Sequence, residues 1–219
     1  MQQTQTGIIY TEFGVYRIPE LEGGEFSLKH SFSFRQYRTI DLGLFALVLL
    51  ISESLIVRAA RFWFPDQLYT VSVVAAVVAI VMMRWGKWAA IHAIFGALIF
   101  CLNSGANGKQ ILIYCFGNLL GLLMLFPRQL LGWEKIRNDG FLSVCFGLLT
   151  LLLMQLGRAL IALAMGALLH DCLGFFTTDA LSLLFTGVII WIARRLDGIF
   201  EDQKHYLLRI HKEEEKGGY

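Results

Sequence analysis

Long apolar runs separated by short polar connections constrain the fold of this chain more than any other feature. Runs of about 15–25 residues recur through its middle, and a helix needs about 20 apolar residues to cross a bilayer. Charged residues make up only 16% of the 219 residues, against roughly 25% in soluble domains. Backbone polar groups in a membrane need internal partners. The runs therefore predict an all-α integral membrane protein.

The apolar runs divide the chain into six predicted transmembrane helices. We place them near residues 40–60, 69–83, 88–102, 111–126, 141–169 and 173–192. All three prolines lie outside these runs, as continuous helices prefer. The six helices make up a transmembrane domain over residues 39–195. A polar arm over residues 1–38, with some alternation of apolar and polar residues, precedes this domain, and a charged tail over residues 196–219 follows it.

Lysine and arginine are unevenly divided among the connections between the runs. They are frequent in the arm, in the loops after the second and fourth runs, and in the tail, and they are sparse in the other three loops. Cytoplasmic loops carry an excess of these residues. We therefore expect both termini in the cytoplasm, and an even number of spans agrees with that placement.

The sequence holds no motif that indicates enzymatic chemistry. It has no HExxH of a metalloprotease and no GxSxG of a serine hydrolase, and its four cysteines form no CxxC pair. The loop SGANGKQ departs from the phosphate-loop pattern, which requires glycine where Asn103 stands and serine or threonine where Gln110 stands. We expect no enzyme, no catalytic residues, no bound metal, no cofactor and no nucleic-acid partner.

An arginine lies inside the fifth apolar run, LLLMQLGRALIALAMGALL. Arg158 would cost about 2.5–3.5 kcal/mol at a helix centre, and ionisable residues inside a membrane are functional-site candidates by default. Glu53 lies about 13 residues into the first helix and Arg158 about 15–17 residues into the fifth, so their depths are similar at about 1.5 Å per residue. The predicted partner of Arg158 is Glu53, a ligand group, or both.

Other polar residues gather toward the same, outer side of the predicted bundle. In the fourth helix three of them share one face at a spacing of four residues. The sixth helix carries a polar stripe of Thr178, Ser182 and Thr186, entered from a loop that holds Asp179. The pattern favours a cavity open to the outside, although polar pairs that only hold helices together remain an alternative. The predicted substrate-binding residues are Glu53, Asn103, Asn107, Lys109, Gln110, Tyr114, Asn118, Gln155 and Arg158.

Small residues at a spacing of four form a second pattern. Ala75 and Ala79 lie in the second run, and Gly117 and Gly121 form a GxxxG motif in the fourth. Such pairs let helices approach closely. Packing within the chain explains most of them. The second run has no polar stripe, so Ala75 and Ala79 are also candidates for docking a partner membrane subunit.

The stretch MRWGKWAAIHAIFGALIFCLNSGANGKQILIYCFGNLLGLL (Met83–Leu123) resembles the substrate-binding S components of energy-coupling factor transporters. The resemblance covers about residues 38–195. It depends on six short helices, the Arg-Trp-Gly-Lys turn into the third helix and the polar outer loop before the fourth. It implies a subunit of a bacterial cytoplasmic membrane that binds a vitamin or related micronutrient from outside. A transmembrane coupling subunit and two ABC ATPases would then drive delivery inward.

This chain departs from that family in its first helix. The family usually carries an AxxxA docking motif there, whereas this helix has Gly43 and Ala46 and then Ser52. Ala46 is therefore a docking candidate beside the two alanines of the second run. Arg158 and Lys109 favour an anionic ligand. The alternative function is a non-transporting membrane scaffold similar to the morphogenesis protein MreD, which has no need of a polar outer half.

Overall fold

The computed structural model describes residues 8–11, 14–17, 34–65, 70–126, 132–196, 199–200 and 203. The chain divides into two compact units, Met1–Ile40 and Asp41–Tyr219. In the first unit, strands β1 (Ile8–Thr11) and β2 (Gly14–Arg17) pair antiparallel. This hairpin falls where the predicted polar arm alternates, and it adds a small β element to the all-α prediction.

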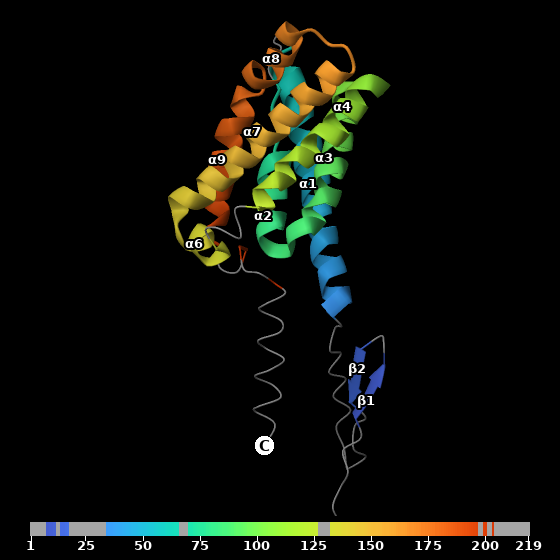
Figure 1. Ribbon diagram of the computed structural model, residues 1–219, viewed down its shortest axis with the longest axis vertical. Coiled ribbons are helices and arrows are strands. Elements are labelled where there is room, and N and C mark those ends of the chain that lie inside the picture. The colour runs from blue at the N-terminus through green and yellow to red at the C-terminus, as the bar shows by residue number, and fades with distance from the viewer. Residues whose placement is uncertain are drawn as a thin grey trace, which may run out of the picture. The chain divides into compact units, whose positions relative to one another are not determined.

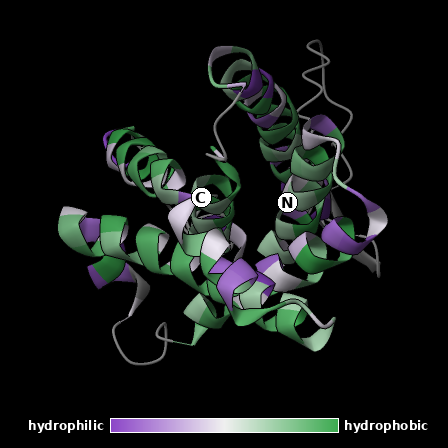
Figure 2. Ribbon diagram, turned by 90° about the horizontal axis from the view of Figure 1, so that it is seen from above, coloured by the Kyte–Doolittle hydropathy of each residue, from purple (hydrophilic) through white to green (hydrophobic). Residues whose placement is uncertain are grey.

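The described part of the second unit is built of helices (Figure 1). They are α1 (Phe34–Trp63, which begins in the first unit), α2 (Val74–Trp85), α3 (Ala89–Ser104), α4 (Gly108–Asn118), α6 (Trp133–Asn138), α7 (Gly140–Ala164), α8 (Leu169–Thr177) and α9 (Ala180–Ala193), with the 3₁₀ helices η1 (Gly86–Trp88) and η2 (Leu119–Leu125). Hydrophobic residues dominate most of these helices, whereas the short α6 is mostly polar (Figure 2).

Five helical stretches in the described residues are long and apolar enough to cross a membrane. They are Arg35–Trp63, Val74–Ser104, Gly108–Leu125, Gly140–Ala164 and Leu169–Ala193. The prediction of several apolar helices able to cross a membrane is confirmed, and they fit a multi-pass membrane protein.

Local sequence determines several helix ends. Asn107 accepts a hydrogen bond from the backbone N–H of Gln110, whose side chain accepts one from the backbone N–H of Asn107, so the two form a capping box at the start of α4. Asp139 accepts from the first backbone N–H groups of α7. Gly105 ends α3 at φ 72°, and Gly86 ends α2 at φ 59°, conformations that favour glycine.

The stretch Val74–Ser104 reverses direction at Gly86, because α2 and α3 pack side by side (Figure 1). The contact is close at Gly96, where an added Cβ would lie 2.7 Å from a methyl group of Val74. Helix α2 has 12 residues, or about 18 Å of helix, which is less than the roughly 30 Å of a bilayer core. All of its residues are buried.

The burial of α2 corrects one docking prediction. Ala75 and Ala79 are 2% and 0% exposed, and α2 packs among α3, α7 and α9 of its own chain. A partner subunit cannot reach these alanines in this structure, so their proposed docking role is wrong here. The second run lacks a polar stripe because it forms the core of the bundle. Ala46 is half-buried on α1.

Helix α1 is attached to the bundle by polar contacts spread along its length. Asp41 forms an ion pair with Arg84 at 2.8 Å, and Asn103 accepts a hydrogen bond from Arg58 at 3.0 Å. The opposite face of α1 within the second unit is apolar and exposed. That face consists of Leu44, Leu47, Val48, Ile51 and Leu55.

Candidate functional site

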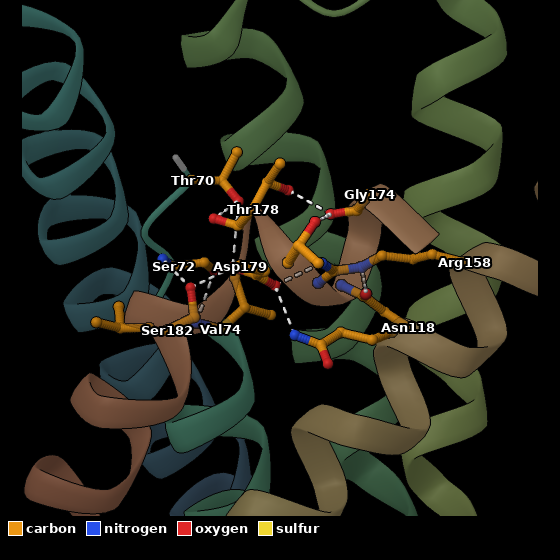
Figure 3. A network of polar contacts seen from close by, with 12 residues as sticks. Thr70, Ser72, Val74, Asn118, Arg158, Gly174, Thr178, Asp179 and Ser182 are labelled. Carbon is orange, nitrogen blue, oxygen red and sulfur yellow. Dashed lines mark hydrogen bonds and ion pairs between the residues drawn. The ribbon is translucent and has the colours of Figure 1, made fainter. Parts of the chain in front are cut away.

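Arg158 lies in α7, six residues before the helix ends, and it is only 3% exposed. Its Nη1 donates to Asp179 at 3.0 Å, and its Nε donates to the Asn118 side chain at 2.8 Å (Figure 3). Its guanidinium lies 4.5 Å from the centre of the Tyr114 ring, within range for a cation–π contact. The arginine is therefore compensated by three side chains from two other segments of the chain, α4 and the connection between α8 and α9.

The predicted pairing of Arg158 with Glu53 is wrong, since the carboxylate that Arg158 contacts is Asp179. Glu53 instead accepts a hydrogen bond from the backbone N–H of Val73 at 2.8 Å, at the start of α2. A negative group there is favoured because the first N–H groups of a helix are unsatisfied and carry partial positive charge. Both carboxylates are buried, Glu53 at 0% and Asp179 at 2% exposed.

Asp179 is the centre of the polar cluster. Its Oδ2 accepts from Arg158 and from the Gln155 side chain at 3.4 Å. Its Oδ1 accepts from the hydroxyl groups of Ser182 and Thr70. Four donors from three segments thus converge on one carboxylate (Figure 3), which is the environment that a buried carboxylate requires.

Three interruptions of regular α-helix meet at this cluster. The segment Thr70–Val73 is non-helical and leads into α2, Thr178 and Asp179 separate α8 from α9, and α4 gives way to η2 after Asn118. The first two interruptions are joined directly, because the Thr70 N–H donates to the carbonyl of Thr178 at 2.9 Å. Irregular backbone at membrane depth is tolerated only where protein or a water-filled cavity surrounds it.

Glycines in α4 and α7 allow the close contact on which the cluster depends. A Cβ on Gly117 would lie 2.5 Å from the backbone nitrogen of Arg158, and a Cβ on Gly157 would meet the carbonyl of Gly117. The two helices therefore touch through their backbones, as GxxxG-type contacts permit. This approach places Asn118, the next residue of α4, against the Arg158 side chain.

Aromatic side chains adjoin the charged groups. Tyr114 stacks on Phe100 with ring centres 5.0 Å apart and meets the edge of Phe175 at 5.9 Å. With Arg158 over Tyr114, one face of the guanidinium borders an apolar, aromatic environment. Such a mixture of a few fixed polar groups with apolar rings is typical of small-molecule sites.

Two polar oxygen atoms beside these contacts have no hydrogen-bond partner among the described residues. They are Oε1 of Glu53 and Oε1 of Gln155, and both side chains are 0% exposed. Buried acceptors without donors are uncommon in proteins.

The structure brings some predicted site residues together and separates others. Tyr114, Asn118, Gln155 and Arg158 form one cluster, with Glu53 near its edge at the start of α2. Four predicted residues lie outside it. They are Asn103, which holds α1 to α3, Asn107 and Gln110, which cap α4, and the exposed Lys109.

The sequence analysis missed Asp179 as the partner of Arg158. The polar stripe that begins at Thr178 was visible in the sequence, and Asp179 directly precedes the apolar run of α9. Arg158 lies about 9 Å below the end of α7. A carboxylate at the start of the next long apolar run was therefore a candidate at a similar depth.

Comparison with protein-family models, curated proteins and solved structures finds no match to this chain. Its function is therefore inferred from the geometry of the cluster.

Proposed function

We propose that this protein is the substrate-binding membrane subunit of a transporter of the energy-coupling factor type. The observation that carries the proposal is the convergence of three helix interruptions on one buried ion pair, Arg158 with Asp179. Transporters form their midplane binding sites in this way, from discontinuous helices whose ends face the ligand and its counter-charges.

The energetic cost of the cluster supports a binding role. A buried ion pair is weak evidence for stability, because replacing it with well-packed apolar residues is often neutral or stabilising. Stability alone therefore does not explain the four polar residues inside this apolar bundle, which are Arg158, Asp179, Asn118 and Gln155. Charged residues within membrane segments usually mark a substrate or ion pathway.

The proposed topology has six crossings, with both termini on the cytoplasmic side of a bacterial plasma membrane. Its support is the reversal between α2 and α3, which divides one of the five long apolar stretches into two antiparallel segments. Among the described residues of the second unit, the end with Arg84, Lys87, Lys135, Arg137, Arg194 and Arg195 would face the cytoplasm.

The proposed partners are a small-molecule substrate, a transmembrane coupling subunit and two ABC ATPases. Because α2 is enclosed by its own chain, the coupling subunit would bind elsewhere. The exposed apolar face of α1 and the half-buried Ala46 beside it remain compatible with such contact. Lipid would cover that face in the isolated subunit.

Native mass spectrometry of the full chain, released from detergent micelles, tests the proposal. We expect a small molecule to be retained by the wild type and by Arg195→Ala. Arg195 stacks on Trp191 at the opposite end of α9 from Asp179. Retention should be lost in Arg158→Lys, which keeps the positive charge but not the forked donor geometry. An unaltered ligand peak in a folded Arg158→Lys variant would place the ligand elsewhere.

A second candidate is the non-transporting scaffold, and one observation favours it. Arg158 already has acceptors for Nε and Nη1 within its own chain, as a purely structural cross-link would. For a scaffold, no metabolite is retained by the wild type, and no vitamin, nucleobase or precursor changes its melting temperature. The Arg158 variants would then differ from the wild type in stability alone.

A further inference from the structure

The place that Asp179 occupies is a carboxylate site built mainly by other helices. Two donors from α7, Nη1 of Arg158 at 3.0 Å and Nε2 of Gln155 at 3.4 Å, point at the same carboxylate oxygen. The Oδ1 of Asn118, on α4, accepts a hydrogen bond from Nε of Arg158 and so fixes the guanidinium. These three side chains are 3%, 0% and 0% exposed, respectively. Their arrangement binds a carboxylate whether or not that group belongs to Asp179.

Asp179 reaches this site from a segment outside regular helix. It lies between α8 and α9 at φ −98° and ψ 16°, and the backbone there is joined to the non-helical Thr70–Val73 segment. Its other oxygen, Oδ1, accepts hydroxyl donors from Thr70 and Ser182. Those hydroxyl groups rotate freely about one bond and can satisfy a withdrawn carboxylate.

The surroundings of Arg158 indicate what kind of molecule could replace Asp179. The hydrogen bonds of Arg158 to described residues use Nε and Nη1, so Nη2 is the part of the guanidinium that could bind a second oxygen. Its face lies over Tyr114, which contacts two phenylalanines. A carboxylate on an aromatic body matches the cation, the rings and the bidentate geometry.

We propose that Asp179 is an internal stand-in for the carboxylate of an aromatic acid, which displaces it from Arg158 when the ligand binds. This inference rests on the proposed function and names the ligand class of the same site. The exchange keeps one carboxylate on the guanidinium throughout, so the buried arginine is never left without a counter-charge, and the withdrawn Asp179 keeps the hydroxyl donors of Thr70 and Ser182. Asp179 then acts as a competitor within the chain, and it weakens apparent ligand affinity in proportion to its occupancy.

Removing the competitor provides the test, with benzoate as the probe. In full-length Asp179→Ala, Arg158 loses its counter-charge and benzoate gains an empty site. We expect benzoate to bind this variant at least roughly tenfold more tightly than the wild type and to raise its melting temperature by a larger amount. Benzamide, which has the same shape without the charge, should do neither. All titrations are made at constant ionic strength.

Two further variants keep the result interpretable. Asp171→Ala removes an exposed aspartate from α8 and should behave as the wild type does toward benzoate. Asp179→Asn keeps the side-chain volume and removes the charge, and it replaces Asp179→Ala if the alanine variant is not recovered folded. Equal benzoate affinity in the Asp179 variant and the wild type would overturn the inference, as would an equal response to benzamide.

The outcome can be separated from that of the proposed function. A neutral metabolite retained by the wild type, with no benzoate effect in the Asp179 variant, refutes the stand-in role and leaves the transport proposal intact. A benzoate effect in the Asp179 variant, with no metabolite retained by the wild type, supports the carboxylate site and counts against transport.

Discussion

Substituting Gly117 with alanine should separate α4 from α7. It should thereby disturb the polar cluster, because Gly117 directly precedes Asn118 in the chain. The added Cβ would lie 2.5 Å from the backbone nitrogen and 2.6 Å from the Cα of Arg158, where ordinary contact begins at 3.4 Å. The helices must therefore move apart by about 1 Å, the difference between 2.5 Å and 3.4 Å, because backbone atoms cannot rotate away. That movement weakens the 2.8 Å hydrogen bond from Arg158 to Asn118.

Three terms determine the size of the effect on the free energy of unfolding. Overpacking costs about 1–3 kcal/mol, and a weakened interhelical hydrogen bond in a membrane costs roughly 0.6 kcal/mol. The higher helix propensity of alanine offsets about 1 kcal/mol. With overpacking at about 2 kcal/mol, the middle of its range, the net destabilisation expected for Gly117→Ala is about 1.6 kcal/mol, or roughly a 15-fold smaller ratio of folded to unfolded protein.

Reversible unfolding in mixed detergent and SDS micelles measures this quantity. Gly187→Ala is the matched control, because its Cβ would lie 3.8 Å from the nearest side-chain atoms, on α7, at ordinary contact distance. It should leave stability unchanged or slightly higher. Equal stability of the two variants would show that the close approach of α4 and α7 does not constrain the fold. In addition, Asn118→Ala should cost less in the Gly117→Ala background than in the wild type.

Three other substitutions test individual contacts by the same unfolding assay. Glu53→Ala should lower stability by about 1 kcal/mol because α2 loses the acceptor at Val73, whereas Glu53→Gln, which keeps an acceptor, should cost less; a reversed order would contradict the capping role. Asn107→Ala should cost about 1 kcal/mol through the lost helix cap without altering ligand retention, and loss of ligand would return this residue to the binding site. Asp41→Asn should cost about 3–5 kcal/mol because it removes the negative charge that pairs with the largely buried Arg84, and a loss below 1 kcal/mol would show that water reaches that pair.

The prediction of the helices succeeded because membrane insertion depends on local composition. An apolar run must satisfy its own backbone whatever it packs against, so its position along the chain is visible without a partner. The need of Arg158 for a compensating group was visible for the same reason, since the cost of a charge in an apolar run does not depend on which helices pack beside that run. Whether the cluster binds a substrate remains a prediction.

The errors concern relations between helices. Similar depths along straight helices led to the prediction that Glu53, a ligand group or both would pair with Arg158. Depth alone does not distinguish the neighbours of a helix, and Asp179 is the carboxylate that packing brings to the guanidinium. Ala75 and Ala79 were candidates for docking a partner subunit because small residues favour close approach, but the same property suits a helix buried within its own chain.

The sequence by itself therefore determined that the chain forms apolar helices and that one of them carries a buried cation requiring compensation. Only the tertiary structure decided which groups provide that compensation. The backbone contact at Gly117 places Asn118 against Arg158. The break between α8 and α9 places Asp179 against Arg158. Glu53 accepts a hydrogen bond from the N–H of Val73 and so caps the start of α2. These choices depend on distances between segments far apart in the chain, and no local pattern of residues specifies such distances.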